Sequence, residues 1–260
     1  MMLSGKRGSI PLLFSALLFI LQASNAQSQE IDDGKWQFQL APYAWLPGQE
    51  GTVSTLPGLP TVDLDLDFWD DILGNIHGAI FLIGEARKDR FGLFADIAYT
   101  DIELEENTPG SYFSTFSSQT KTWMATASGF YRVVDNPQNY LDFLAGVRYW
   151  DISSKLKLTA GALAQQSVTN KENWFDPVVG MKGLTYFGSS NFFASGGFSI
   201  GGFGVGSDLM WDANINFGYA WSTTFSATIG YRYLDVDYDD GGYVYDVAQS
   251  GPTVGLSWRF

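Results

Sequence analysis

The last ten residues of the chain, 251–260, alternate strictly between two kinds of side chain. One set of alternate positions is small or polar, and the other is apolar throughout: Pro252, Val254, Leu256, Trp258 and Phe260. Because successive side chains of a β-strand point to opposite faces, this segment predicts a strand with one apolar and one polar face. Two environments suit such a strand: a soluble sheet with one face in water, or a barrel wall with lipid outside and a wet lumen inside.

The N-terminal residues 1–26 have the pattern of a secretory signal peptide. Lys6 and Arg7 form a short basic region, an almost unbroken apolar run covers residues 10–21, and small residues precede a cleavage position after Ala26. The apolar run is too short to cross a bilayer as a helix, which needs roughly 20 residues. We therefore expect export, and a mature chain of residues 27–260 that forms one barrel domain.

Charge and composition exclude several functions. The chain has a net charge of −13, and an acidic chain lacks the clustered lysines and arginines that bind nucleic-acid phosphates. It contains no cysteine, so it forms no disulfide and carries no thiol chemistry. Aromatic residues make up 16% and there are 29 glycines, a composition that suits strands which bury large rings and turn tightly.

Alternation recurs along the whole mature chain. It is clearest over 208–221, and it predicts further strands near 36–44, 77–87, 91–103, 121–132, 140–152, 174–187, 191–203, 224–237 and up to Phe260. Most connections alternate between short turns and long loops, as in outer-membrane barrels, with long loops expected at 107–118, 154–173 and 237–246. The link at 204–207 is an exception because it is short. A further long connection reaches residue 75 and contains a predicted helical turn at 68–73.

These patterns predict an all-β protein, an antiparallel up-and-down transmembrane β-barrel of about ten strands, with eight or twelve as the alternatives. In a closed sheet the last strand, which carries Trp258 and Phe260, must pair with the first. Three of the predicted strands end with a tyrosine that precedes an aspartate by two residues, and these are Tyr99, Tyr149 and Tyr233. We expect the three tyrosines to form an aromatic girdle at one membrane interface.

Charged residues gather on the faces predicted to point inward. By alternation the lumen-lining set comprises Glu85, Arg87, Asp96, Asp142, Arg148, Asp176, Lys182, Asp208, Asp212, Arg232 and Arg259. Such charges require a wet or fully paired interior, because each unpaired buried ion costs several kcal/mol. Two uses fit them: an ion-pair plug that fills a narrow barrel, or the lining of a constricted pore.

No motif in the sequence predicts catalysis or metal binding. His77 is the one histidine, and its neighbours Asp70 and Asp71 resemble the acid–histidine pairs of outer-membrane barrel proteases, but nothing else matches that family. The aspartate runs that begin at Asp63 and Asp235 lack the glycine and glutamate that a calcium-binding EF-hand loop needs. We therefore expect solvated acidic loops, no catalytic residue, no metal and no cofactor.

Three segments and the C-terminus carry a family resemblance. Residues 42–48, 201–208 and 230–238, together with the terminal Phe260, resemble small, porin-like Gram-negative outer-membrane β-barrel proteins of unassigned function. The resemblance implies a barrel in the cell outer membrane, with lipid as its surroundings and the barrel-assembly machinery as its partner during insertion. It implies no catalytic residues.

Three functions follow as hypotheses. The first is a structural or porin-like barrel with a narrow charged lumen that passes small solutes. The alternative is a surface binding or adhesion module that uses long acidic extracellular loops. A barrel hydrolase that depends on His77 is the distant alternative.

Overall fold

Alternating side chains produce an almost entirely β-structure. The computed structural model describes residues 34–55, 60–108 and 112–260, so the predicted signal peptide lies outside the described residues. The strands are β1 (Gln37–Trp45), β2 (Gly48–Ser54), β3 (Val62–Leu66), β4 (Ile76–Lys88), β5 (Phe91–Asn107), β6 (Phe113–Asp135), β7 (Asn139–Ala160), β8 (Gln166–Tyr186), β9 (Phe192–Gly201), β10 (Leu209–Ala220), β11 (Phe225–Asp240) and β12 (Tyr243–Arg259).

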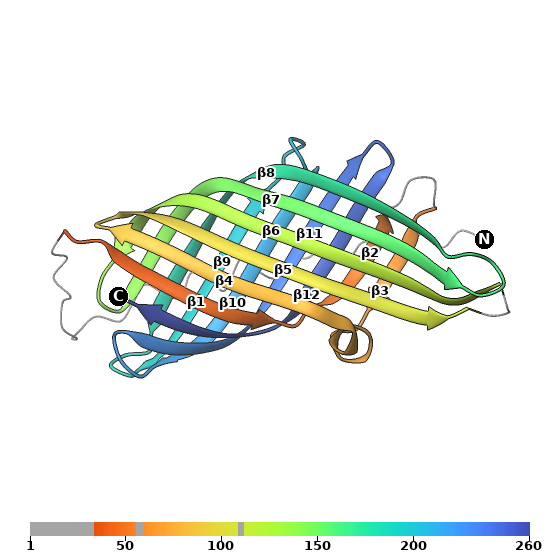
Figure 1. Ribbon diagram of the computed structural model, residues 1–260. Coiled ribbons are helices and arrows are strands. Elements are labelled where there is room, and N and C mark those ends of the chain that lie inside the picture. Colours follow the sequence, from red (N-terminus) through yellow and green to blue (C-terminus); the bar gives the residue numbers. More distant parts are fainter. Residues whose placement is uncertain (1–33, 56–59, 109–111) are drawn as a thin grey trace, which may run out of the picture.

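Ten of these strands form a closed antiparallel barrel (Figure 1). Each strand from β4 to β12 pairs with the next in sequence, β1 pairs with β4, and β12 returns to β1, which confirms the ten-strand prediction. At the seam Gln39 lies opposite Arg259, and the backbones of Phe38 and Phe260 exchange hydrogen bonds of 2.9 and 3.0 Å. The predicted pairing of the first and last strands is therefore confirmed.

The two remaining strands lie beyond the barrel wall, and the sequence patterns did not predict them. β12 pairs with β1 along its second half and with β2 along its first half, so β1 and β2 follow one another along the same edge. β3 then pairs with β2. At the junction Gly251 packs so close to the carbonyl oxygen of Leu46 that a Cβ atom would collide with it. Glycine is thus required where one edge of β12 changes partner.

Two short helical turns, η2 (Phe68–Ile72) and η3 (Leu73–Asn75), connect β3 to β4 and confirm the predicted turn at 68–73. Asp67 begins η2 because its Oδ1 accepts hydrogen bonds from the backbone N–H groups of Trp69 and Asp70, at 2.7 and 3.1 Å. Phe68 and Ile72 are buried beneath the turn. No helix in the described ranges is both long and apolar enough to span a bilayer.

The two ends of the barrel differ. The short turns lie at one end of the barrel, together with the start of β1 and the end of β12. In outer-membrane barrels the end with short turns is the periplasmic end. At the other, extracellular end, the prediction of three long loops is wrong. The second half of 107–118 belongs to β6, which begins at Phe113, and most of 154–173 belongs to β7, which ends at Ala160, and β8, which begins at Gln166. In 237–246, Gly241 and Gly242 alone separate β11 from β12. Outside the membrane both faces of a strand can meet water, so these strands need no alternation of apolar and polar residues.

The outer surface carries a band of exposed apolar side chains. The band includes Leu40, Ile80, Leu93, Val147, Val179, Ile215, Ile229, Val254 and Leu256. At its periplasmic border, Phe38 contacts Phe260 and Phe91 contacts Tyr131, with ring centroids 5.8 and 5.0 Å apart. At its extracellular border lie Tyr99, Trp123, Tyr149, Phe175, Trp211 and Tyr233, which we call the extracellular girdle.

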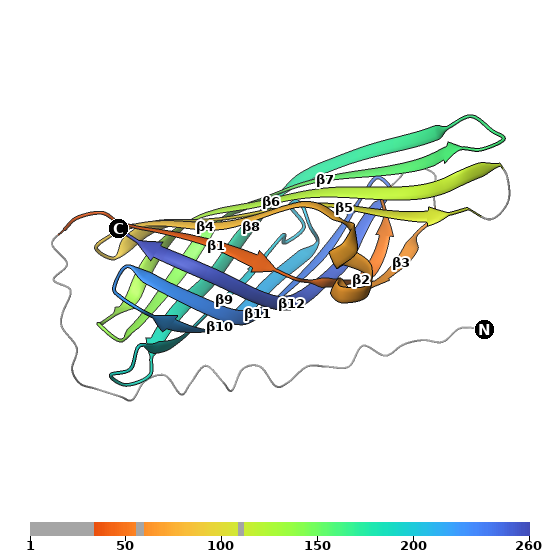
Figure 2. The ribbon, with the colours of Figure 1, turned by 60° about the horizontal axis from the view of Figure 1, so that its bottom comes forward.

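The wall has an uneven extracellular rim. β6, β7 and β8 contain 23, 22 and 21 residues, whereas β9 and β10 contain 10 and 12, close to the roughly 9–11 that a membrane crossing needs. The parts of β5–β8 beyond the girdle therefore project as a sheet, which we call the arm (Figure 2). Asn170 of β8 connects it to the end of β2 through a 3.1 Å hydrogen bond to the backbone oxygen of Thr55. The extracellular parts of β11, β12, β2 and β3 form a second projection, the acidic sheet.

Candidate functional site

The interior is crossed at mid-height by a network of five side chains, the central network: Tyr43, Asp96, Arg148, Asp212 and Arg232. Asp212 accepts hydrogen bonds from Arg148 at 2.8 Å and from Arg232 at 2.6 Å. Arg232 also donates to Asp96 at 3.0 Å and to the Tyr43 hydroxyl at 2.8 Å, and Tyr43 donates to Asp96 at 2.8 Å. Two arginines balance two aspartates, and the residues come from β1, β5, β7, β10 and β11, so the network joins distant parts of the wall.

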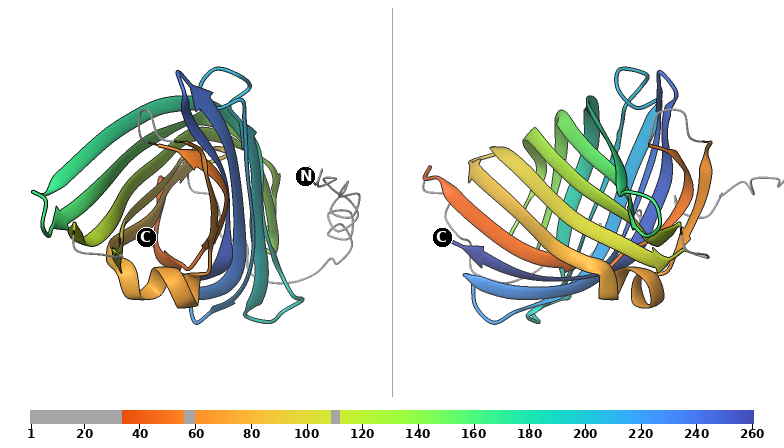
Figure 3. Two further views of the ribbon diagram at one scale, coloured as in Figure 1. Left: turned by 90° about the vertical axis from the view of Figure 1, so that its right-hand side faces the viewer. Right: turned by 45° about the vertical axis from the view of Figure 1, so that its right-hand side comes forward.

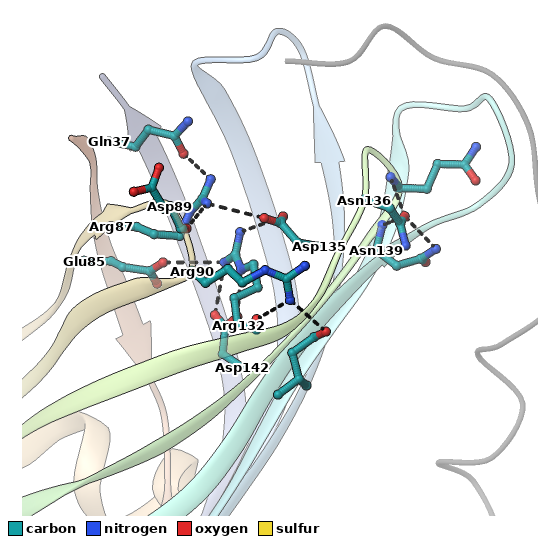
Figure 4. A network of polar contacts seen from close by, with 12 residues as sticks. Gln37, Glu85, Arg87, Asp89, Arg90, Arg132, Asp135, Asn136, Asn139 and Asp142 are labelled. Carbon is teal, nitrogen blue, oxygen red and sulfur yellow. Dashed lines mark hydrogen bonds and ion pairs between the residues drawn. The ribbon is translucent and has the colours of Figure 1, made fainter. Parts of the chain in front are cut away.

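A second group of charges lies toward the periplasmic end, and we call it the periplasmic network (Figure 4). Arg132 binds Asp142 through two hydrogen bonds of 2.7 and 3.0 Å, and Lys182 bridges Asp142 and Glu85 at 2.9 and 2.6 Å. Arg87 lies 3.8 Å from Asp135. Asp142 is fully buried, so its two cationic partners are needed to offset the loss of hydration.

Arg132 also points into the lumen, but the predicted lumen-lining set omits it. Arg132 is two residues from the buried Phe130 on β6, so alternation along the strand could have identified it. Arg259 donates a 3.0 Å hydrogen bond to Gln39 near the seam. Asp208 takes no part in either network. It is exposed at the extracellular rim, because the β9–β10 turn is short and β10 begins only at Leu209.

Asp176 differs from the other interior charges because no cation contacts it within the described ranges. Its carboxylate accepts hydrogen bonds from the Ser207 backbone N–H at 2.6 Å, the Ser207 hydroxyl at 2.8 Å and Trp150 Nε1 at 2.9 Å. Trp174 Nε1 donates to the Ser207 hydroxyl at 2.9 Å. This fully buried carboxylate therefore holds the turn between β9 and β10 against the inner face of β7 and β8.

An apolar layer fills the lumen on the extracellular side of the central network. It is composed of buried side chains that include Trp45, Met124, Trp150, Ile152, Trp174, Val178, Met210, Leu234, Val236, Tyr238 and Tyr245. The rings of Trp174 and Tyr238 are stacked with centroids 3.9 Å apart, although β8 and β11 share no backbone pairing there. Burial, together with the nearby Glu172 carboxylate, raises the pKa of the Tyr238 hydroxyl to about 12. The sequence patterns predicted a charged lumen and missed this layer.

A cavity of about 230 Å³ lies between the two networks and the opposite wall. Strands β9–β12 contribute small polar side chains to it, among them Ser195, Asn214, Asn216, Thr228 and Ser257. Long charged side chains from β4, β7 and β8 occupy the other half of the lumen. The cavity ends at the central network, which separates it from a smaller apolar pocket of about 50 Å³ beneath η2 and η3.

The described residues contain no group of three or more histidine, aspartate or glutamate side chains placed to hold a metal ion. His77 lies half-exposed on β4, and its Nδ1 is 3.6 Å from a Glu103 oxygen. The aspartates that start at Asp63 belong to β3, and those that start at Asp235 belong to β11, so both predicted acidic loops are strands. No catalytic constellation forms around these residues in the described part of the chain.

A closed wall, an apolar outer band between two aromatic borders, and a polar, filled interior define a transmembrane β-barrel of the Gram-negative outer membrane. No protein-family model matches the sequence, and no curated protein is significantly similar to it.

Solved structures that match most of this chain do so at low sequence identity and low TM-score. The attachment invasion locus protein Ail of Yersinia pestis is 13% identical, with 86% of this chain and 98% of that chain covered and a TM-score of 0.34. The translocator domain of the autotransporter NalP from Neisseria meningitidis is 12% identical over 86% and 87%, with a TM-score of 0.38. The Pseudomonas putida toluene transporter TodX is 10% identical over 86% and 88%, with a TM-score of 0.32.

Proposed function

We propose that this protein is a barrel closed to passive solute flow, which anchors a strand-built binding surface outside the outer membrane. The main support for a closed barrel is that two layers of side chains fill the lumen one after the other near its middle. The central network joins five strands, and the apolar layer covers it on the extracellular side. Apart from the partly buried Tyr43, the members of both layers are at most 6% exposed, including Trp150 at 2%, Met210 at 0% and Arg148 at 3%.

The same layers argue against a constitutively open pore. A solute that enters the 230 Å³ cavity meets paired charges, and passage requires these pairs to separate inside a wall of low polarity. Breaking one buried ion pair costs on the order of 3–5 kcal/mol. Beyond the pairs, closely packed tryptophan and methionine side chains leave no polar path. The charged side chains that the sequence suggested as pore lining therefore serve as a plug.

Conductance tests this proposal. The refolded protein, inserted into a planar lipid bilayer, should produce no stepwise current at moderate voltage. Insertion is verified separately in vesicles by the barrel's resistance to added protease and by a change of gel mobility on heating. Discrete, reproducible conductance steps from protein that passes both checks would contradict a closed barrel and favour the porin-like alternative.

The arm and the acidic sheet support the second half of the proposal, a binding surface. The expected long loops are instead paired strands, so this surface is already ordered. Little conformational entropy is therefore lost when a partner binds. Ser154 and Asn170 lie directly opposite each other on β7 and β8, which offers a place to shorten the arm.

An arm-shortened variant should keep the barrel and lose surface binding. Residues 155–169 are replaced by Asn-Gly, which closes a two-residue hairpin between Ser154 and Asn170. We expect unchanged heat-dependent gel mobility, together with a several-fold loss of attachment of intact cells to protein-coated surfaces. A variant with equal attachment would show that the arm is not the binding surface.

A further inference from the structure

Basic residues at the extracellular end are confined to one place. Among the described residues beyond the extracellular girdle, the lysines and arginines are Lys121 on β6, Lys155 and Lys157 on β7, and Lys171 on β8. We call these four residues the lysine patch. Carboxylates lie beside the patch and across the rest of that end: Asp101, Glu103 and Glu105 on β5, Asp151 on β7, and Glu50, Asp65, Asp237, Asp239 and Asp246 on the acidic sheet.

Strand register brings the four lysines together on one face. Ser153 on β7 lies opposite Lys121 of β6 on one side and opposite Lys171 of β8 on the other. Lys155 and Lys157 are two and four residues further along β7, so all four share the face of Tyr149 in the extracellular girdle. At about 3.4 Å per residue, the row that contains Ser153 lies roughly 14 Å along the strand from Tyr149.

Three of these lysines have no acidic partner. Within the described ranges no carboxylate lies at ion-pair distance from Lys155, Lys157 or Lys171, whereas Lys121 contacts Asp101 at 3.1 Å. Lys155 and Lys171 are exposed, and their neighbours on the adjoining strands are polar and uncharged: Gln119 and Thr169 beside Lys155, Ser153 beside Lys171. The three lysines thus present positive charge that no ion pair neutralises, on a face that also carries Asp151 of β7 two residues before Ser153.

The arm turns this face toward the membrane. Seen onto the extracellular end, β6, β7 and β8 sweep outward past the rim of the barrel (Figure 3). The outer face of the arm continues the lipid-facing surface below it, so it lies over the outer leaflet just beyond the girdle. Long lysine side chains can extend several ångströms to place their ammonium groups at the headgroups.

We propose that the lysine patch binds the phosphate groups of anionic lipids in the outer leaflet. The ammonium group is a compact charge that suits a phosphate, and its position at headgroup level supplies the ligand at high local concentration. The carboxylates of β5 and of the acidic sheet repel the same headgroups. Anionic lipid therefore gathers along β6–β8 and not around the whole barrel.

Lipid enrichment tests this proposal. The full barrel is reconstituted in nanodiscs of phosphatidylcholine with a minority of phosphatidylglycerol at low salt, and the lipids retained after brief detergent exposure are quantified by mass spectrometry. Wild type should retain phosphatidylglycerol preferentially. The triple variant Lys155→Gln, Lys157→Gln, Lys171→Gln should lose most of this preference, by about fivefold per lysine, which corresponds to the roughly 1 kcal/mol expected for each basic residue near an anionic surface.

Two matched controls separate charge from fold and position. Replacing the same three lysines with arginine should preserve the preference, and Lys88→Gln, which removes an exposed charge at the periplasmic end, should leave it unchanged. No preference in wild type, or equal preference in wild type and the glutamine variant, overturns the proposal. If millimolar inorganic phosphate abolishes the preference at constant ionic strength, the patch is a site for free anions and the lipid assignment fails.

Discussion

An Asp212→Ala variant should lose about 3–5 kcal/mol of unfolding free energy, because the substitution leaves two buried arginines without their shared carboxylate. Asp212 accepts from Arg148 at 2.8 Å and from Arg232 at 2.6 Å, and all three side chains are at least nine-tenths buried. Asp96 remains as a partner for Arg232, but Arg148 then retains only its 2.8 Å hydrogen bond to Thr126. The loss should therefore come mainly from the uncompensated charge of Arg148.

Urea titration of the protein in lipid vesicles, followed by tryptophan fluorescence, measures this loss. Asp208→Ala is the matched control, because Asp208 is exposed, takes part in neither network, and should change stability by no more than about 0.5 kcal/mol. An Asp212→Asn variant keeps the shape of the side chain and should fall between them. If Asp212→Ala and Asp208→Ala have equal midpoints, the central network does not stabilise the barrel.

Asp176→Ala should cost about 2–4 kcal/mol by a different mechanism. No buried cation is left behind, but the Ser207 backbone N–H, the Ser207 hydroxyl and Trp150 Nε1 lose their acceptor. Trp174 Nε1 loses a 3.3 Å hydrogen bond to Asp176 and keeps the one to the Ser207 hydroxyl. Each buried donor left without a partner costs roughly 1–3 kcal/mol, and water that enters the space offsets part of the sum. The turn that links β9 and β10 should loosen, since this carboxylate fastens it to the inner wall.

Limited proteolysis of intact cells should reveal that loosening as new cleavage within residues 202–208, alongside a lower urea midpoint. Ser207→Ala removes one of the four hydrogen bonds to this carboxylate and should have a smaller effect, so the two variants form a graded series. Equal protease resistance and equal stability in wild type and Asp176→Ala would mean that the turn is held by other contacts.

Alternation predicted the membrane-crossing half of the barrel well because lipid and lumen impose opposite demands on successive residues. The seam between β1 and β12 and the short periplasmic turns were predictable for that reason. β2, β3 and the outer parts of β6–β8 were not predicted as strands. Residues 62–66 and 155–158 do alternate between apolar and charged side chains, but these runs are short and lie among polar residues. Residues 154–173, for example, read as a polar loop, although 154–160 belong to β7 and 166–173 to β8.

The sequence predicted which strand faces point into the lumen, but it predicted only some of the ion pairs that form there. Arg132 and Asp142 face each other across the β6–β7 hairpin, and the turn between them is recognisable in the sequence. Arg232 and Asp96 are 136 positions apart, and only the closure of the barrel brings them together. The apolar layer around Trp150 and Trp174 was missed because a wet lumen was assumed at all depths, whereas tryptophan on the inner face indicated a dry one.

The seam also imposes an order on assembly. Gln39 and Arg259 are partners 220 positions apart in the sequence, so the wall cannot close until β12 has been synthesised and exported. Until then both edges of the growing sheet expose unpaired backbone groups, which lipid cannot satisfy. Because contacts of such high sequence separation form slowly, closure should be the slow step of biogenesis. A chain truncated before β12 would remain a sheet with two open edges, and it would be a substrate for periplasmic proteases.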